Sequence, residues 1–449
     1  MEANYKADER AYSCKQYLVG NTTPLFKKID IFVFFILLLF IMLYQVQLVF
    51  EWISILRVRE LLYAYLYIRI IFFYKLKIPY ASLLVIAYLA YSIFIFFHTM
   101  MIYDMTLALQ GFMRFVNVAL LAPLATTIIA NKKQLQFIIN LWCIVFFIGF
   151  ITAFYQLIGG DLSWLLGDYI AVRGGLVRAK TLLGEPNIGA MASIFIISYA
   201  FYGALKSFWR TLLVVISSLF IIISLSKAAI AGLIVFVCLS LLINYKAIGY
   251  YKTKNVIKLM QLIIIFTFII ITLVFLLPEV NIIIDRYFNV AISAFTGTGE
   301  IQGTTKGIWH DLINRAYFYP QRYIENALSR SDTPLLHLII GNSFGAAGSV
   351  ARGLDIEGAV LPHNSYLEIV LVGGLFMLII FLFFIKTAYK RLMLIRKQDI
   401  GLSFLVFWLI LFVIFMISYP IIYEPFLGAL FWIVVGVAFN NRLYKEVFE

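Results

Sequence analysis

Long apolar runs recur throughout this chain, and they constrain its fold more than any other feature. Runs of roughly 18 or more apolar residues are typical of membrane-spanning helices. Hydrophobic residues make up 63% of the 449 positions and charged residues only 13%, which is far more apolar surface than a water-soluble core absorbs. The sequence therefore predicts an all-α, polytopic transmembrane bundle with one large, partly helical outer loop.

At about 20 apolar residues per crossing, we expect about 12 spans. They are 31–50, 60–75, 78–98, 105–130, 135–157, 188–204, 211–224, 227–244, 258–278, 366–386, 402–419 and 424–440. Most of the 36 Lys and Arg residues then share a side with the N-terminus, so the positive-inside rule places both termini in the cytoplasm. The net charge of +13 follows from these loops and does not indicate a nucleic-acid partner.

This topology divides the chain into five parts. They are a cytoplasmic arm at 1–30, spans one to nine at 31–278, a large outer loop at 279–365, spans ten to twelve at 366–440, and a cytoplasmic tail at 441–449. A shorter outer loop occupies 158–187. We expect the large loop to be partly helical, and Gly341, Gly345 and Gly348 to mark tight turns. Outer loops of this length are usually functional.

The most informative stretch is LPHNSYLEIVLVGG, residues 361–374, at the end of the large loop. His363 stands in a short polar segment directly before an apolar run. Asn364 or Ser365 can cap the helix that follows by accepting from its free N–H groups. A titratable imidazole at this boundary suits acid–base chemistry on a lipid-linked phosphate. The alternative is an interfacial histidine satisfied by a neighbour, and spacing alone leaves both open.

Cations gather on the same outer side. Arg173, Arg178 and Lys180 precede Glu185-Pro186-Asn187, which has the pattern of a helix start. An outer loop should be poor in basic residues, so this cluster favours a phosphate-binding role over a solvated loop. Lys227 at the next outer turn, Arg286 and Arg352 in the large loop, and Tyr366 beside Asn364 complete the predicted substrate-binding set. Lys227 is equally compatible with a side chain that snorkels to the headgroups. Arg286 could instead form a surface ion pair with Asp285, and Arg352 could be solvated or contact saccharide.

Two further arginines fall inside expected spans. Arg114 lies in the fourth and Arg69 in the second. Charged residues at membrane depth are costly and are functional candidates by default, although Arg69 could also snorkel to the interface. The sequence contains no paired carboxylates at metal-ligand spacing, no phosphate-binding P-loop and no nucleophile elbow, so we expect neither a metal nor a cofactor.

Three blocks then stand in a recognisable order: RAKTLLGEPN, SLSKAA, and IIGNSFG followed by PHNSYLEIVLVGG after a large outer loop. Over roughly residues 135–440 the chain resembles the O-antigen ligase and polymerase family of bacterial inner-membrane glycosyltransferases. The resemblance implies a GT-C-like fold, His363 as the catalytic histidine, and Arg178 and Arg286 as cations for the undecaprenyl pyrophosphate of the donor. The chain departs from the family pattern at Lys227, where Arg is usual, and at Met377 in the helix motif.

The resemblance makes a Wzy-type O-antigen polymerase the leading hypothesis. Such an enzyme works at the periplasmic face, where it moves a saccharide from undecaprenyl pyrophosphate onto a lipid-linked repeat unit. Membrane lipid and a chain-length regulator are the other partners we expect. A ligase that transfers polymer to lipid A–core is the nearest alternative. A flippase is a third hypothesis, but transporters usually bind their cargo near the membrane midplane, whereas the polar residues here cluster outside.

Overall fold

The computed structural model describes residues 24–43, 58–73, 83–157, 160–162, 165, 171–173, 176–178, 182–203, 205–224, 226–245, 321, 334–344 and 364–448. These residues are helical apart from one hairpin and short connections. The first helices are α2 (Pro24–Met42), α5 (Val58–Phe73), α6 (Leu83–Ile102), α7 (Met105–Asn117), α8 (Leu121–Ile128) and α9 (Lys132–Leu157). Next come β1 (Ala171–Arg173), β2 (Leu176–Arg178), α11 (Pro186–Tyr202), α12 (Ser207–Ser224) and α13 (Lys227–Tyr245). The last elements are α18 (Pro334–Ile340), α20 (Ser365–Gln398), η3 (Ile400–Leu402), α21 (Phe404–Phe415), η4 (Ile421–Tyr423), α22 (Pro425–Ala438) and α23 (Asn441–Phe448).

Membrane-spanning character is evident in the described helices. Four of them are long and apolar enough to cross a bilayer, namely Leu83–Ile102, Met105–Ile128, Lys132–Gln156 and Ser365–Gln398. The bent pair α22 and α23 makes a fifth if it counts as one span. Three other apolar helices in the described part are shorter. The expected span 258–278 lies outside the described residues, and the total of about 12 stays a prediction.

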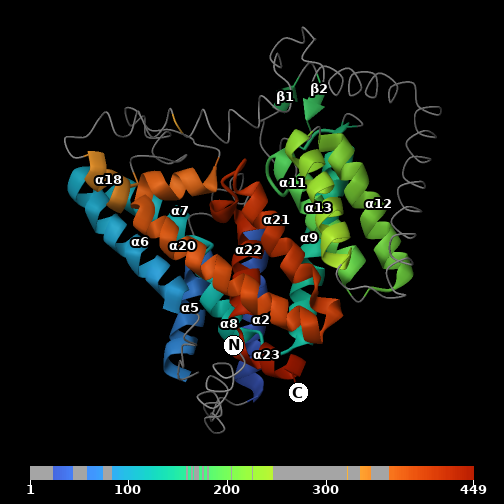
Figure 1. Ribbon diagram of the computed structural model, residues 1–449, viewed down its shortest axis with the longest axis horizontal. Coiled ribbons are helices and arrows are strands. Elements are labelled where there is room, and N and C mark those ends of the chain that lie inside the picture. The colour runs from blue at the N-terminus through green and yellow to red at the C-terminus, as the bar shows by residue number, and fades with distance from the viewer. Residues whose placement is uncertain are drawn as a thin grey trace.

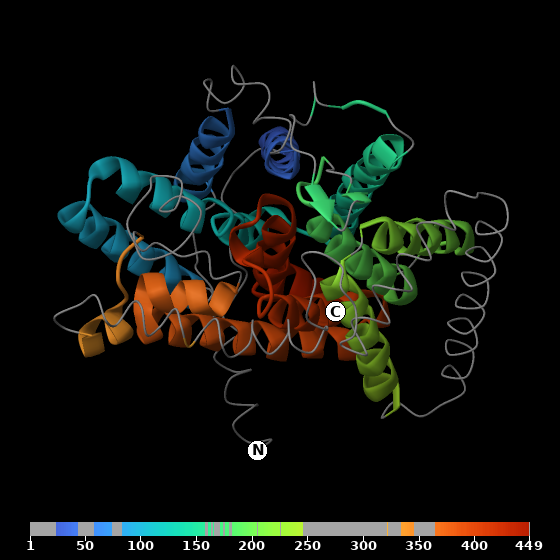
Figure 2. The same cartoon turned by 90° about the horizontal axis from the view of Figure 1, so that it is seen from above.

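Helix α22 forms the centre of the bundle (Figures 1 and 2). Every residue from Phe426 to Ala438 is buried, because α22 is apolar on all faces and is surrounded by other helices. It crosses α8 at close range, because a Cβ on Gly436 would lie 2.5 Å from the Ala122 carbonyl. Small residues let membrane helices approach this closely. The view from above shows α20 along one side of α22, with α2 and α5 on the other.

Helix α20 is longer than the predicted span 366–386 and is kinked. Gly374 has φ 70° and ψ −176°, which only glycine adopts readily. The kink makes room for α18 and the residues after it, since a Cβ on Gly374 would lie 2.2 Å from the Ile339 carbonyl. The N–H of Asn342 donates to the Leu371 carbonyl at 2.9 Å. Gly341 has φ 90°, which confirms the tight turn predicted there.

The hairpin lies within the loop 158–187 and was not predicted. Strands β1 and β2 pair in antiparallel register, with Ala171 opposite Arg178 and Arg173 opposite Leu176. Figure 1 places it beside the beginning of α11, at the end of the bundle opposite α23. The hairpin therefore belongs to the same end of the molecule as the first turns of α11 and α20.

Candidate functional site

The first turn of α20 follows His363 directly. Asn364 is the N-cap, and its side-chain oxygen accepts from the Leu367 N–H at 3.0 Å. This confirms that one of the two predicted residues caps the helix. Ser365 has a different role, because its hydroxyl donates to the Tyr419 carbonyl at 2.9 Å. The Tyr366 hydroxyl donates to the Val413 carbonyl at 2.7 Å. The start of α20 is therefore fixed to the end of α21 and the connection after it.

The Glu185-Pro186-Asn187 block opens α11, as the sequence predicted. Pro186 takes the first helical position, where its missing N–H costs nothing, and Glu185 is the preceding cap residue. The Glu185 carboxylate accepts a hydrogen bond from the Tyr419 hydroxyl at 2.9 Å. Glu185 is exposed and Asn187 is partly buried.

Tyr419 joins these two blocks, which stand about 180 positions apart in the chain. Its carbonyl accepts from Ser365 and its hydroxyl donates to Glu185. Tyr419 belongs to residues 416–424, which connect α21 to α22 and which we call the outer connector. Sequence reasoning missed this residue, since nothing local predicts which loop tyrosine meets a distant carboxylate.

Glu424 ends the outer connector and caps α22, accepting from the Leu427 N–H at 2.5 Å. Burial raises the pKa of Glu424 to about 8. The neighbouring Glu185 charge also raises it, whereas the backbone N–H groups of Leu427 and Phe426 lower it. Sequence reasoning missed Glu424 too, although the dipeptide Glu424-Pro425 repeats the Glu185-Pro186 signal that marked the start of α11.

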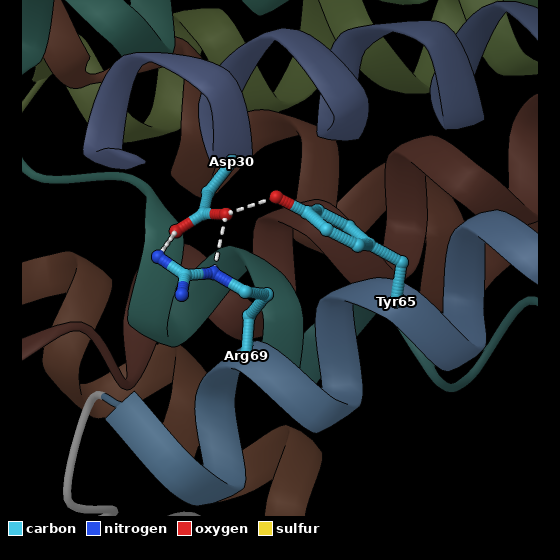
Figure 3. A network of polar contacts seen from close by, with 3 residues as sticks. All are labelled: Asp30, Tyr65 and Arg69. Atoms are coloured by element: carbon cyan, nitrogen blue, oxygen red, sulfur yellow. Dashed lines mark hydrogen bonds and ion pairs between the residues drawn. The ribbon is translucent and has the colours of Figure 1, made fainter. Parts of the chain in front are cut away.

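The two predicted intramembrane arginines both have carboxylate partners. Arg114 on α7 lies 3.0 Å from Glu368 in the first turns of α20, and its guanidinium stands 5.7 Å from the Tyr423 ring centre. Arg69 on α5 pairs with Asp30 on α2 at 3.0 Å (Figure 3). Arg114 therefore lies at the end of α20 that carries the predicted site residues. Arg69 belongs to a separate contact between α2 and α5.

The remaining predicted site residues are described in part or not at all. The backbones of Arg173 and Arg178 lie in the hairpin, and the backbone of Lys227 begins α13. Their side chains, and the whole of Lys180, Arg286, Arg352 and His363, lie outside the described residues. The expected turn at Ser224–Lys227 is confirmed, because α12 ends at Ser224 and α13 begins at Lys227.

The described part of the site thus combines two helix starts, α11 and α20, with a connector that carries Tyr419, Tyr423 and Glu424. Helix N-termini carry a partial positive charge and free N–H groups, which favour anionic ligands. The carboxylates and hydroxyls beside them suit hydroxyl-bearing ligands. Comparison with protein-family models and with curated proteins gave no match to this chain.

Proposed function

We propose that this protein is a membrane glycosyltransferase of the O-antigen polymerase type. In this proposal, a GT-C-like bundle of about 12 spans sits in the bacterial inner membrane with its active site on the periplasmic face. The enzyme extends an undecaprenyl-pyrophosphate-linked saccharide by one repeat unit at each turn. The proposal rests on the resemblance of the three sequence blocks to that family. Its single structural support is the contact of Tyr419 with both Ser365 and Glu185, which joins two of those blocks at one end of the bundle.

The chemistry assigned to the residues is a displacement at the anomeric carbon of the donor. A hydroxyl of the acceptor saccharide forms the new bond to that carbon while the bond to the pyrophosphate oxygen breaks. His363 takes the proton of the attacking hydroxyl as general base. Arg178 and Arg286, with Arg173, Lys180, Lys227 and Arg352, neutralise the charge that develops on the pyrophosphate.

His363→Ala tests this assignment. In a host whose own copy of the gene is deleted, we expect the variant to be made at the wild-type level and to yield no polymer. His98→Ala on α6 is the matched control, since His98 has no role in the proposed reaction. The readout is the ladder of lipopolysaccharide bands. A wild-type ladder from His363→Ala would remove this histidine from the mechanism.

The deletion itself separates polymerase from ligase. Loss of the ladder with single repeats retained on lipid A–core is the outcome expected for a polymerase. Loss of all repeats from the core, with lipid-linked polymer accumulating, would instead identify a ligase.

A further inference from the structure

Two ion pairs with a buried carboxylate, in the described part of the chain, differ in how many hydrogen bonds that carboxylate accepts. In the first, Asp30 accepts from Arg69 through both oxygens, at 3.0 Å and 3.2 Å, and from the Tyr65 hydroxyl at 3.0 Å. Figure 3 shows the guanidinium facing the carboxylate, with the Tyr65 hydroxyl at one oxygen. This pair has the full set of hydrogen bonds that makes a buried charge tolerable, and it joins α2 to α5.

The second pair, Arg114 and Glu368, is incomplete. The Nη1 atom of Arg114 lies 3.0 Å from Oε1 of Glu368, which is 1% exposed. Despite this distance, neither Glu368 oxygen has a hydrogen bond of good geometry among the described residues. The charges are close, but the N–H groups are not directed at the oxygens. Both oxygens of the carboxylate can therefore still accept hydrogen bonds.

Two tyrosine hydroxyls next to this pair also lack hydrogen bonds of good geometry. Tyr88 on α6 is fully buried and Tyr423 on the outer connector nearly so, and each interacts with the Glu368 charge. The two hydroxyls are close enough to interact with each other, but within the described part of the chain neither makes a hydrogen bond of good geometry. The two Glu368 oxygens and the two tyrosine hydroxyls thus form one buried cluster at the first turn of α20, in which no atom has a hydrogen bond of good geometry within the described residues.

Isolated unsatisfied atoms occur in many proteins, but a cluster of them is unusual, because buried polar groups are nearly always hydrogen-bonded. A group that satisfies this cluster must donate to Glu368 and exchange hydrogen bonds with tyrosine hydroxyls. A metal cation is disfavoured by the Arg114 charge, and an anion by Glu368. A neutral O–H group satisfies all of these atoms, and a water molecule needs only two to four such partners.

We propose that Arg114, Glu368, Tyr88 and Tyr423 form an internal site for O–H groups, occupied by water in the resting protein. The site gives the outer end of the bundle a buried carboxylate in contact with exchangeable water. Water occupancy is independent of the proposed function. A saccharide hydroxyl of the acceptor is the other source of an O–H group. Its replacement of the water rests on the proposed function.

X-ray radiolytic labelling of the purified full-length protein in water enriched in oxygen-18 tests for bound water. Radicals formed from ordered water modify the side chains beside it. Tyr199 is the matched control, since it is equally buried but its hydroxyl is hydrogen-bonded to the Gln136 side chain. We expect Tyr88 to be labelled several-fold faster than Tyr199. Labelling of Tyr88 no faster than Tyr199 would overturn the proposal.

A double variant links the water to the ion pair. Replacing both partners of a buried pair by apolar residues is often tolerated, whereas removing one leaves an unpaired charge. The variant R114M/E368L should therefore keep its helicity and yield while labelling of Tyr88 falls to the Tyr199 rate. The variant D30L/R69M is the control, and it should leave Tyr88 labelling unchanged. Full Tyr88 labelling in R114M/E368L would contradict the site.

Purified lipid-linked repeat unit separates the two sources of the O–H group. If its addition lowers Tyr88 labelling in the wild-type protein, a saccharide hydroxyl has replaced the water. If labelling stays at the resting rate, the site binds water alone and the part of the proposal that concerns the acceptor is wrong. Neither result requires turnover, so the assignment of His363 stands or falls separately.

Discussion

Glu424 and Glu185 show how single residues set the electrostatics of the outer end. Each carboxylate caps a helix or stands at its cap position, where the helix N-terminus favours negative charge. Glu185 is exposed and hydrogen-bonded to Tyr419, whereas Glu424 is partly buried and has a pKa of about 8. Burial is therefore what sets the pKa of Glu424, although its chain context resembles that of Glu185.

The raised pKa of Glu424 makes stability depend on pH. The pKa of about 8 in the folded protein lies above 4.5, the ordinary pKa of glutamate. Between pH 4.5 and pH 8, the folded protein therefore keeps a proton that the unfolded chain has released. This contribution is complete below about pH 4.5 and is lost as the pH rises to about 8, with a slope of at most about 1.4 kcal/mol per unit. In detergent, the wild-type Tm should fall from pH 5 to pH 8 more steeply than that of Glu424→Gln.

Glu446→Gln is the control for this measurement. Glu446 accepts from the Lys132 N–H at the opposite end of the bundle, so its replacement should leave the wild-type slope unchanged. Equal slopes in the wild type and in Glu424→Gln would show that Glu424 is ionised throughout this pH range.

At the scale of elements, helix starts could be predicted from the sequence and long-range contacts could not. The caps at Asn364 and Glu185-Pro186 and the turn at Gly341 follow from residues within one helical turn of each other. The kink at Gly374 does not, because it depends on a backbone segment more than 30 positions away that comes close only in the fold. The partners of Arg114 and Arg69 were missed for the same reason.

Gly374→Ala measures what the kink contributes. The alanine would carry its Cβ at positive φ and 2.2 Å from the Ile339 carbonyl, so α20 or the 339–344 segment must move. We expect the free energy of unfolding to fall by more than about 2 kcal/mol, from backbone strain and the clash together. Ile379→Ala, at a position 50% exposed on the same helix, should change it by about 0.5 kcal/mol or less. Equal effects of the two changes would mean that α20 can straighten freely.

At the scale of the whole molecule, the bundle has two chemically different ends. One end carries the Glu185, Asn364 and Tyr419 contacts. At the other, Lys132 pairs with Asp399 at 2.7 Å and its N–H donates to Glu446. Helix α9 connects the two ends, since its 26 residues extend about 39 Å. Positive charge concentrated at the Lys132 end favours the cytoplasm for that side.

Labelling at the two ends of α9 decides which end faces which compartment. Asp161, just beyond the far end of α9, and Lys133, in its first turn, are both exposed. In a background where Cys14, Cys143 and Cys238 are replaced by Ser, a membrane-impermeant maleimide applied to intact spheroplasts should label Asp161→Cys and spare Lys133→Cys. Both should react after lysis, which controls for reactivity. The reverse pattern would put the first turn of α20, which follows His363 directly, on the cytoplasmic side. A periplasmic polymerase would then be impossible for this chain, because the proposed base would lie across the bilayer from its substrate.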